Sequence, residues 1–151
     1  MMPEFKIKEL ELKTRKCIKE DYPFVFKIMK ELIFPFVSKY FKPSKEMFDE
    51  RFNEDYNERT ILLGDDTEVG LYQLKIEDDV LVVNGLFIIA KYQKKGIGKV
   101  LMDYFETLGY NKIILQVWDN NPAFNFYKKL GYKVVKMEKH KYHMEKKIKL
   151  E

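Results

Sequence analysis

The sequence is poor in cysteine and histidine, with one cysteine and two histidines among 151 residues. The single thiol, Cys17, excludes an internal disulfide and a cysteine metal cluster, and it favours a reducing compartment. No stretch approaches 18 uninterrupted apolar residues, and the N-terminal "MMPEFKIKEL" lacks the apolar core of a signal peptide. We therefore expect a cytoplasmic protein with no metal and no membrane contact.

The sequence also lacks a strong excess of either charge. Its 28 basic and 24 acidic residues give a net charge of +4 that is spread along the chain, which does not indicate attraction to nucleic acid. The one basic cluster, "KMEKHKYHMEKKIKL", is diluted by Glu138 and Glu145. Because polar and apolar residues alternate there, we interpret it as a solvated edge strand, with nucleic-acid binding as the minority alternative.

What the chain has is the composition of a folded protein, with 46% hydrophobic and 15% aromatic residues. No linker, repeat or low-complexity segment interrupts it, so we expect residues 1–151 to form one domain. Hydrophobic spacing predicts a strand, two helices, three strands, a helix, a strand, a helix and two closing strands. These elements span residues 12–21, 22–41, 44–56, 60–64, 68–76, 79–89, 97–108, 112–118, 121–131, 132–137 and 142–150.

Several residues mark where these elements break, begin or end. Pro35 is expected to kink the first helix or divide it in two, and Ser44 to cap the next one. Gly109 is placed to end the helix that starts at residue 97. Because a strand, a crossover helix and the next strand normally form a right-handed parallel unit, strands four and five (79–89 and 112–118) should run parallel in an otherwise antiparallel sheet.

The stretch "YQKKGIGKVL" places two glycines and three lysines where a strand gives way to a helix. Unpaired N–H groups at a helix start attract anions, and glycines at 96 and 98 would let phosphate oxygens approach them closely. The alternative is that Gly96 is only a turn residue and Gly98 only a helix-packing contact. A Walker A loop is excluded by Gln93 and Val100, and a Rossmann fingerprint lacks its third glycine because Leu101 is there.

Two motifs resemble those of the GNAT superfamily of acetyl-CoA-dependent N-acetyltransferases. "LFIIAKYQKKGIGKVLMDYF" is similar to the central motif of that family, and "LQVWDNNPAFNFYKKLGY" is similar to its second motif. They lie in the expected order, and the predicted element order agrees over nearly the whole chain. The resemblance implies an α+β fold with a mixed, mostly antiparallel sheet of about seven strands flanked by about four helices, in which strands four and five diverge.

The resemblance also implies which residues hold the cosubstrate acetyl-CoA. The backbone amides of the turn would bind the pyrophosphate, and main-chain groups of the preceding strand would bind the pantetheine arm. The turn residues are Gln93, Lys94, Lys95, Gly96, Ile97, Gly98 and Lys99, and the strand residues are Leu86, Phe87 and Ile88. An asparagine near the thioester is also implied, and both Asn120 and Asn121 fit it, with helix capping as the alternative role.

Acetyl transfer to an amine needs a proton acceptor and a proton donor. By motif position Tyr127 is the donor, and packing with Phe126 is its alternative role. No comparable base is present, because several relatives carry a glutamate on the fourth or fifth strand, where this chain has apolar residues in "LFII" and Gln116 in "LQVW". Asp119 and the turn residues Glu77, Asp78 and Asp79 are candidates that we expect to be solvated turn residues. We expect surface roles for His140 and His143.

From the sequence we therefore predict an enzyme that acetylates a primary amine by direct attack in a ternary complex, acting as a monomer or homodimer. A covalent acyl-enzyme is not favoured, because Cys17 lies in the first strand without an evident histidine partner. The main alternative is a non-catalytic CoA-binding module, which the missing base supports. The acceptor stays open among polyamines, antibiotics, amino acids and protein N-termini.

Overall fold

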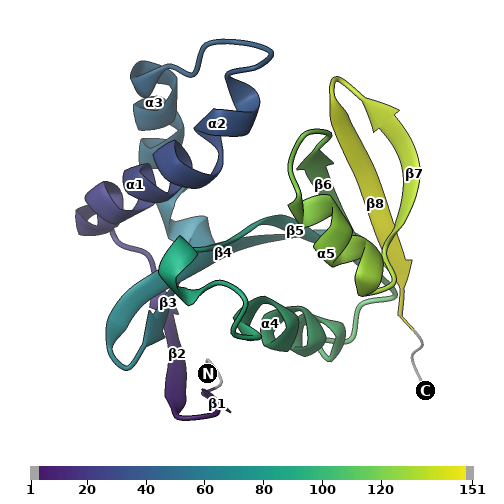
Figure 1. The fold of residues 1–151 in the computed structure, drawn as a ribbon, viewed down its shortest axis with the longest axis horizontal. Helices are drawn as coiled ribbons and strands as arrows, with labels where there is room; N and C mark the ends of the chain where they lie inside the picture. Colours follow the sequence, from purple (N-terminus) through teal and green to yellow (C-terminus); the bar gives the residue numbers. More distant parts are fainter. Residues whose placement is uncertain (1–3, 149–151) are drawn as a thin grey trace. The chain divides into compact units, whose positions relative to one another are not determined.

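The computed structural model describes residues 4–148, and within that range it contains eight strands and five α-helices (Figure 1). In chain order these are β1 (Phe5–Ile7), β2 (Leu10–Lys16), α1 (Tyr22–Leu32), α2 (Phe34–Val37), α3 (Lys45–Asp55), β3 (Arg59–Gly64), β4 (Thr67–Glu77), β5 (Val80–Ile88), α4 (Ile97–Glu106), β6 (Lys112–Trp118), α5 (Ala123–Lys129), β7 (Lys133–Glu138) and β8 (Lys141–Lys147). Lys149 and Leu150, which we assigned to the last strand, lie outside the described residues. No helix among residues 4–148 is long and apolar enough to cross a membrane.

The strands form one sheet in the order β1-β2-β3-β4-β5-β6-β8-β7. The pair β5–β6 is parallel, whereas β1–β2, β2–β3, β3–β4, β6–β8 and β7–β8 are antiparallel. This confirms the predicted mixed sheet and its parallel fourth and fifth strands. The strand count differs because β1, only three residues long, pairs with β2 in a hairpin that the sequence pattern did not indicate.

The chain divides into two compact units. The first contains the residues up to Gln73 together with Leu86–Ile97, and the second contains Leu74–Gly85 and the residues from Gly98 onward. The chain therefore passes from one unit to the other within β4, within β5 and at the start of α4.

The first unit has an aromatic core between its sheet and the helices α1 and α3. Val25 and Ile28 of α1 are buried against Phe52 of α3 and against Ile61 and Leu71 of the sheet. Ser44 caps α3 as predicted, because its hydroxyl accepts a hydrogen bond from the N–H of Met47. The first long helix divides into α1 and α2 next to Pro35, which confirms the predicted break.

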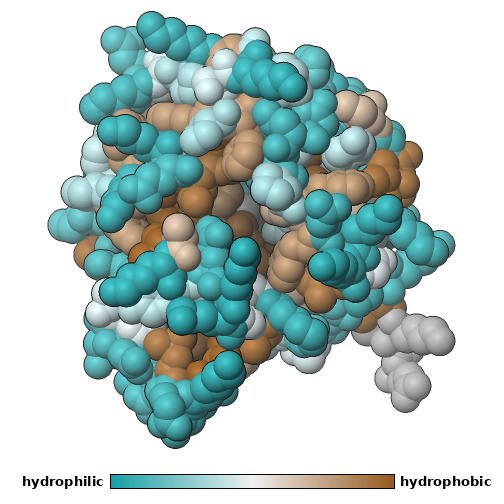
Figure 2. Space-filling view, viewed as in Figure 1, coloured by the Kyte–Doolittle hydropathy of each residue, from teal (hydrophilic) through white to brown (hydrophobic). Residues whose placement is uncertain are grey.

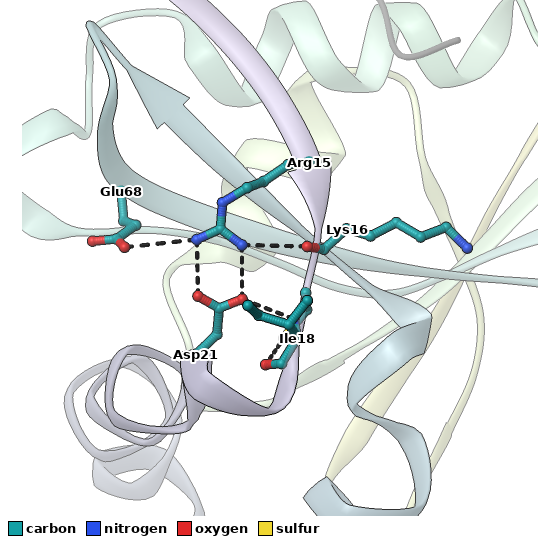
Figure 3. Close-up of polar contacts among 6 residues, drawn as sticks. Arg15, Lys16, Ile18, Asp21 and Glu68 are labelled. Carbon is teal, nitrogen blue, oxygen red and sulfur yellow. Dashed lines mark hydrogen bonds and ion pairs between the residues drawn. The ribbon is translucent and has the colours of Figure 1, made fainter.

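A buried ion pair ends β2 earlier than predicted (Figure 3). The guanidinium of Arg15 donates to both carboxylate oxygens of Asp21, each at 2.8 Å, and Asp21 is only 7% exposed. The same carboxylate accepts from the backbone N–H of Ile18, and Glu68 lies 3.7 Å from the guanidinium. The chain therefore leaves the sheet after Lys16, and the predicted strand residues up to Asp21 form a loop and a short 3-10 turn.

In the second unit, α5 lies over one face of the strands β6 and β8 (Figure 1), and α4 contacts β8. Lys146 of β8 pairs with Glu106 of α4 at 3.0 Å, and the ring of Phe124 in α5 packs on Tyr142 of β8. The buried residues of this face are Ile113, Leu115, Val117 and Met144. Gly109 follows α4 in a left-handed conformation (φ +93°), but α4 stops at Glu106, two residues before the predicted end, and Leu108 is exposed.

Candidate active site

The glycine turn forms the connection between β5 and α4, as predicted. Lys94 (φ +62°) and Gly96 (φ +91°) both have left-handed backbones, and α4 begins at Ile97. The side chain of Gln93 donates a hydrogen bond of 2.8 Å to the carbonyl of Ile88, which ties the turn to the end of β5. A Cβ atom added to Gly96 would meet only Ile7, at 3.9 Å, so the turn is open on that side. Its first backbone amides have no earlier helical carbonyl to bind.

The second glycine of the turn, Gly98, lies against α5. A Cβ atom built on it would lie 3.1 Å from Cζ of Phe126, which is closer than side chains normally allow. The absence of a side chain at Gly98 therefore lets the start of α4 approach the helix that carries Tyr127. The packing role that we considered for this glycine is confirmed, and the contact joins the start of α4 to α5 within the second unit.

The last residues of β5, Leu86, Phe87 and Ile88, extend beyond the paired part of the β5–β6 ladder. The parallel register runs from Val80 opposite Lys112 to Val83 opposite Leu115 and goes no further. Gly70 of β4 faces the carbonyl of Phe87, which a Cβ atom at this glycine would approach to 2.2 Å. The main chain at the end of β5 is thus held by a close backbone approach and by Gln93.

The two asparagines after β6 have different positions at the start of α5. The side-chain oxygen of Asn121 accepts a hydrogen bond of 2.9 Å from the N–H of Ala123, the first residue of α5, but the N-cap position is occupied by Pro122, so Asn121 lies one residue before the cap and not at it as predicted. Pro122 directly precedes the helix and is not its first residue. Asn120 is half-buried and lies between the end of β6 and Asn121. The hydrogen bond to Ala123 joins the side chain of Asn121 to the helix start.

Tyr127 is buried on α5 and is only 8% exposed. Its ring packs against Phe126, with centroids 5.1 Å apart, and against Tyr132 at 6.0 Å. Burial raises the pKa of Tyr127 to about 12, because ionisation would place a negative charge away from water. Within residues 4–148 the phenol forms no hydrogen bond. The ring therefore has the packing role that we considered as the alternative, and the phenol is protonated at neutral pH.

The β6–β8 register reveals a neighbour of Gln116 that the sequence did not indicate. Gln116 lies directly opposite His143 of β8, on the face of the sheet away from α4 and α5, because the adjacent Leu115 and Met144 are buried beneath these helices. His143 is half-buried, and its neighbours on that face are Lys136 of β7 and Lys141 and Glu145 of its own strand. The alternation of side chains along β8 predicts which face of the sheet His143 occupies. Only the strand register shows that Gln116 is its cross-strand neighbour.

The acidic candidates occupy two separate places in the second unit. Asp79 directly precedes β5, and its carbonyl accepts a hydrogen bond from the N–H of Asn111, just before β6. The side chains of Glu77, Asp78 and Asp79 are exposed, as expected for a turn. Asp119 lies at the other end of β6, with a carboxylate oxygen 4.0 Å from Nδ1 of His140. A seven-residue strand spans about 20 Å, so the turn is remote from Asn120 and Tyr127. Among the described residues, no cluster of three or more histidine, cysteine or acidic side chains could hold a metal ion.

A match to a family model shows which protein family this chain belongs to. A model of the acetyltransferase (GNAT) domain matches residues 57–134, which is just over half of the chain and includes both motifs. The chain belongs to the GNAT family. As a GNAT protein it is an acyltransferase, which confirms the enzyme class predicted from its motifs.

Solved structures with the same fold cover nearly the whole GNAT chain. The PaiA N-acetyltransferase of Thermoplasma acidophilum, solved with coenzyme A, is 25% identical, with a TM-score of 0.71 over 90% of this chain and 98% of that one. The spermidine N-acetyltransferase of Vibrio cholerae, solved with CoA and spermine, is 18% identical, with a TM-score of 0.67 over 91% and 95% of the two chains. The ribosomal-protein-S18-alanine N-acetyltransferase of Escherichia coli is 16% identical, with a TM-score of 0.66 over 93% and 96%. A search of curated proteins finds no match.

Proposed function

We propose that this GNAT protein is an N-acetyltransferase that moves an acetyl group from acetyl-CoA to a primary amine by direct attack in a ternary complex. The observation that carries the proposal is the contact between Gly98 and Phe126, because it joins the start of α4 to the helix that holds Tyr127. Gly98 and Tyr127 both belong to the second unit. The PaiA structure with coenzyme A supports the choice of acetyl donor.

The turn from Gln93 to Lys99 has the features that a pyrophosphate requires. Its glycine at position 96 leaves open space, its backbone turns through two left-handed residues, and Lys94 and Lys95 are exposed beside it. Amide N–H groups at the start of α4 would bind the phosphate oxygens, and main-chain groups of Leu86, Phe87 and Ile88 would bind the pantetheine arm. Acetyl-CoA would supply the activated acyl group, and these residues would hold it in position.

In this reaction the amine nitrogen forms a bond to the acetyl carbon, the bond from that carbon to sulfur breaks, and the sulfur leaves with the bonding electrons. We propose that the phenol of Tyr127 donates its hydrogen to that sulfur. With a pKa of about 12, the phenol is a weak acid but remains protonated throughout the neutral range, so it can stabilise the developing negative charge by hydrogen bonding. Asn120 and Asn121 both remain candidates for a contact near the thioester.

The proton released by the attacking amine needs an acceptor, and we propose His143 for this role. It lies opposite Gln116 of β6, and the resemblance implies a glutamate base on β5 or β6 in several relatives. An imidazole can accept a proton near neutral pH, whereas the amide of glutamine cannot. In this arrangement, the acceptor and Tyr127 act from opposite faces of the β6–β8 strands. We also propose a cytoplasmic location, since the one cysteine of the chain, Cys17, cannot form an internal disulfide and favours a reducing compartment.

Acetyl-CoA consumption with a panel of amines tests the function directly. The panel should contain a polyamine, an aminoglycoside, free amino acids and peptides with free N-termini, each with mass analysis of the product. We expect one class to be acetylated on nitrogen with release of one CoA per acetyl group. Binding of acetyl-CoA without transfer to any of these amines would contradict the proposed function.

A further inference from the structure

The face of the strands β6, β8 and β7 that carries Gln116 and His143 is rich in lysine. The strand registers define this face, because side chains directly opposite each other on neighbouring strands point to the same side of the sheet. Its charged residues are Lys112, Lys133, Lys136, Glu138, Lys141, Glu145 and Lys147. Five lysines against two glutamates give the face a surplus of positive charge.

Both glutamates of this face pair with lysines of the same face. Nζ of Lys136 lies 3.2 Å from a carboxylate oxygen of Glu138, and Nζ of Lys112 lies 3.3 Å from a carboxylate oxygen of Glu145. Each glutamate charge is therefore offset by a neighbouring lysine. A molecule that binds on this face meets a net positive potential, and charge complementarity favours an anionic group on that molecule.

The other face of the same strands is largely apolar. Leu115, Val117 and Met144 are buried there, and Val134 and Met137 of β7 continue it. Figure 2 shows hydrophobic surface at the right-hand edge, where Figure 1 places β7. The surplus of positive charge therefore belongs to the face that carries His143.

Trp118 fixes the position of one lysine on the charged face. It is the only tryptophan in the sequence, and it ends β6 two residues after Gln116. Nζ of Lys141, directly opposite on β8, lies 4.7 Å from the centroid of the tryptophan ring, within the range of a cation–π contact. This contact holds the ammonium group at the end of β6 that leads into Asn120 and Asn121, the two candidates for a contact near the thioester.

We propose that the acceptor carries a carboxylate next to its primary amine, and that Lys141 binds this carboxylate. The inference rests on the proposed function, in which the amine approaches His143. Lys141 and His143 are two residues apart on one face of β8, which places them about 7 Å apart. An acceptor that contacts both must therefore hold its amine and its carboxylate close together. Free amino acids do so, and so do peptides that begin with an aspartate, whereas polyamines and aminoglycosides have no carboxylate for Lys141.

Matched pairs of acceptors test the proposal, because the two members of a pair differ only in one carboxylate. The pairs are L-alanine with L-alaninamide, and the C-terminally amidated peptide Asp-Ala-Ala with its counterpart Asn-Ala-Ala. We expect the acidic member of one pair to have a kcat/KM about tenfold or more above that of its partner and of spermidine. The pair that shows this preference tells whether the carboxylate belongs to a free amino acid or to a peptide.

Two charge reversals locate the preference. In Lys141→Glu, kcat/KM for the acidic acceptor should fall by about tenfold or more through a higher KM, because a carboxylate then faces a carboxylate. Activity with the amide partner should persist, which shows that the variant is folded. Lys129→Glu makes the same change of charge at an exposed position of α5, on the other side of the sheet. It should leave the ratio of the two acceptors within about twofold of wild type, since solvent screens a distant surface charge.

The fluorescence of Trp118 measures acceptor binding without turnover, because the chain has no second tryptophan. Titration of the CoA-bound protein with L-alanine and with Asp-Ala-Ala should change the emission for the acid that is acetylated, more weakly for its amide, and not in Lys141→Glu.

These measurements distinguish a failure of this inference from a failure of the proposed function. Acetyl transfer without a preference for the acid, or with a preference that Lys141→Glu retains, would overturn the inference and leave the proposed function intact. A fluorescence response to the acids that depends on Lys141 but is followed by no transfer would support binding of the carboxylate and contradict the proposed function. Absence of both response and transfer would overturn both.

Discussion

At the scale of single residues, Tyr127 has a buried phenol whose pKa of about 12 keeps it protonated at every working pH. Tyr127→Phe keeps the ring packed against Phe126 and removes only the hydrogen-bond donor. We expect kcat to fall by about 10²-fold and CoA affinity to stay within a few-fold of wild type, since the phenol acts on the sulfur as it leaves. Steady-state kinetics with the identified amine and calorimetry with CoA measure both effects.

The matched control for this substitution is Tyr132→Phe. The hydroxyl of Tyr132 is buried and has no hydrogen-bond partner in the described part of the chain, and burial raises its pKa as well. Removing it deletes the same group from a neighbouring ring without touching Tyr127, and we expect kcat within about twofold of wild type. Equal losses in both variants would mean that the helix packing, and not the phenol of Tyr127, supports turnover.

The cross-strand pair of Gln116 and His143 allows the base to be moved from one strand to the other. We expect His143→Ala to lower kcat/KM by about 10²-fold, the usual size of a general-base effect. Adding Gln116→Glu to this variant should restore part of the rate, because a carboxylate then stands on the neighbouring strand. The acid limb of the pH profile should also move to lower pH, since a carboxylate titrates about 2 units below an imidazole in reference peptides.

Rescue by the second substitution separates this role from a structural one. A residue needed only for folding of β8 would not be replaced by a carboxylate on β6. Unchanged kinetics in His143→Ala would remove the histidine from the mechanism, and a loss without rescue or without a pH shift would assign it to packing.

At the scale of the elements, the connection from β2 to α1 depends on the ion pair of Arg15 and Asp21. The hydrogen bonds from Arg15 lower the pKa of the Asp21 carboxyl, so its charge stabilises the folded state at neutral pH. This contribution is present above the ordinary carboxyl pKa of about 3.9 and is lost as the pH falls through the lower folded-state value. Asp21→Asn should therefore cost about 2 kcal/mol of unfolding free energy at pH 7, and less in acid.

Urea titration at pH 7 and at pH 3 measures both values. Asp103→Asn is the control, because Asp103 pairs with Lys99 on an exposed part of α4 and its loss should cost less than about 0.5 kcal/mol. An equal cost of Asp21→Asn at the two pH values would show that the charge of Asp21 contributes nothing to the stability of this connection.

The elements that the sequence predicted are those with local signals. Apolar spacing located α4, Ser44 located the start of α3, and the glycines located the turn before α4 and, to within three residues, the end of α4 at Glu106. The misplaced end of β2 depends on Arg15 and Asp21, which meet only when the chain turns back on itself. A three-residue strand such as β1 has no pattern long enough to recognise and needs β2 to exist.

In the candidate site, too, the sequence predicted the features that have local signals. Two local motifs gave the turn, the asparagines and Tyr127, because each motif lies in one continuous stretch of chain. Three features depended on distant parts meeting: the contact of Gly98 with Phe126, the burial that raises the pKa of Tyr127, and the position of His143 opposite Gln116. Strand register is set by the whole sheet, so no local pattern could have given the last of these.

At the scale of the whole molecule, bound CoA should stabilise the folded chain, because unfolded chains do not form the turn. Ligand at 100 times its Kd adds about 2.7 kcal/mol, which corresponds to a rise of about 5–10 °C in the melting temperature of a chain of this size. Lys95→Glu places a carboxylate beside the turn and should weaken CoA binding at least tenfold. Lys75→Glu, an equal charge reversal on an exposed part of β4, should not.

Scanning calorimetry with and without CoA gives the shift for each variant. Both lysines are exposed, so neither substitution should change the melting temperature without ligand by more than about 2 °C. Equal CoA stabilisation of the Lys95→Glu and Lys75→Glu variants would move the phosphate site away from this turn.

The division of the chain between two units also orders events during synthesis on the ribosome. The first unit ends with Ile97, so all of its residues exist while the last third of the chain, with β6, α5, β7 and β8, is still to be made. At about 5–20 residues per second, several seconds separate the two moments. During that interval the segment Leu74–Gly85 is already made, but the strands and helices of its own unit are missing. A chaperone that binds nascent apolar strands would find its target there, at "DVLVVNG".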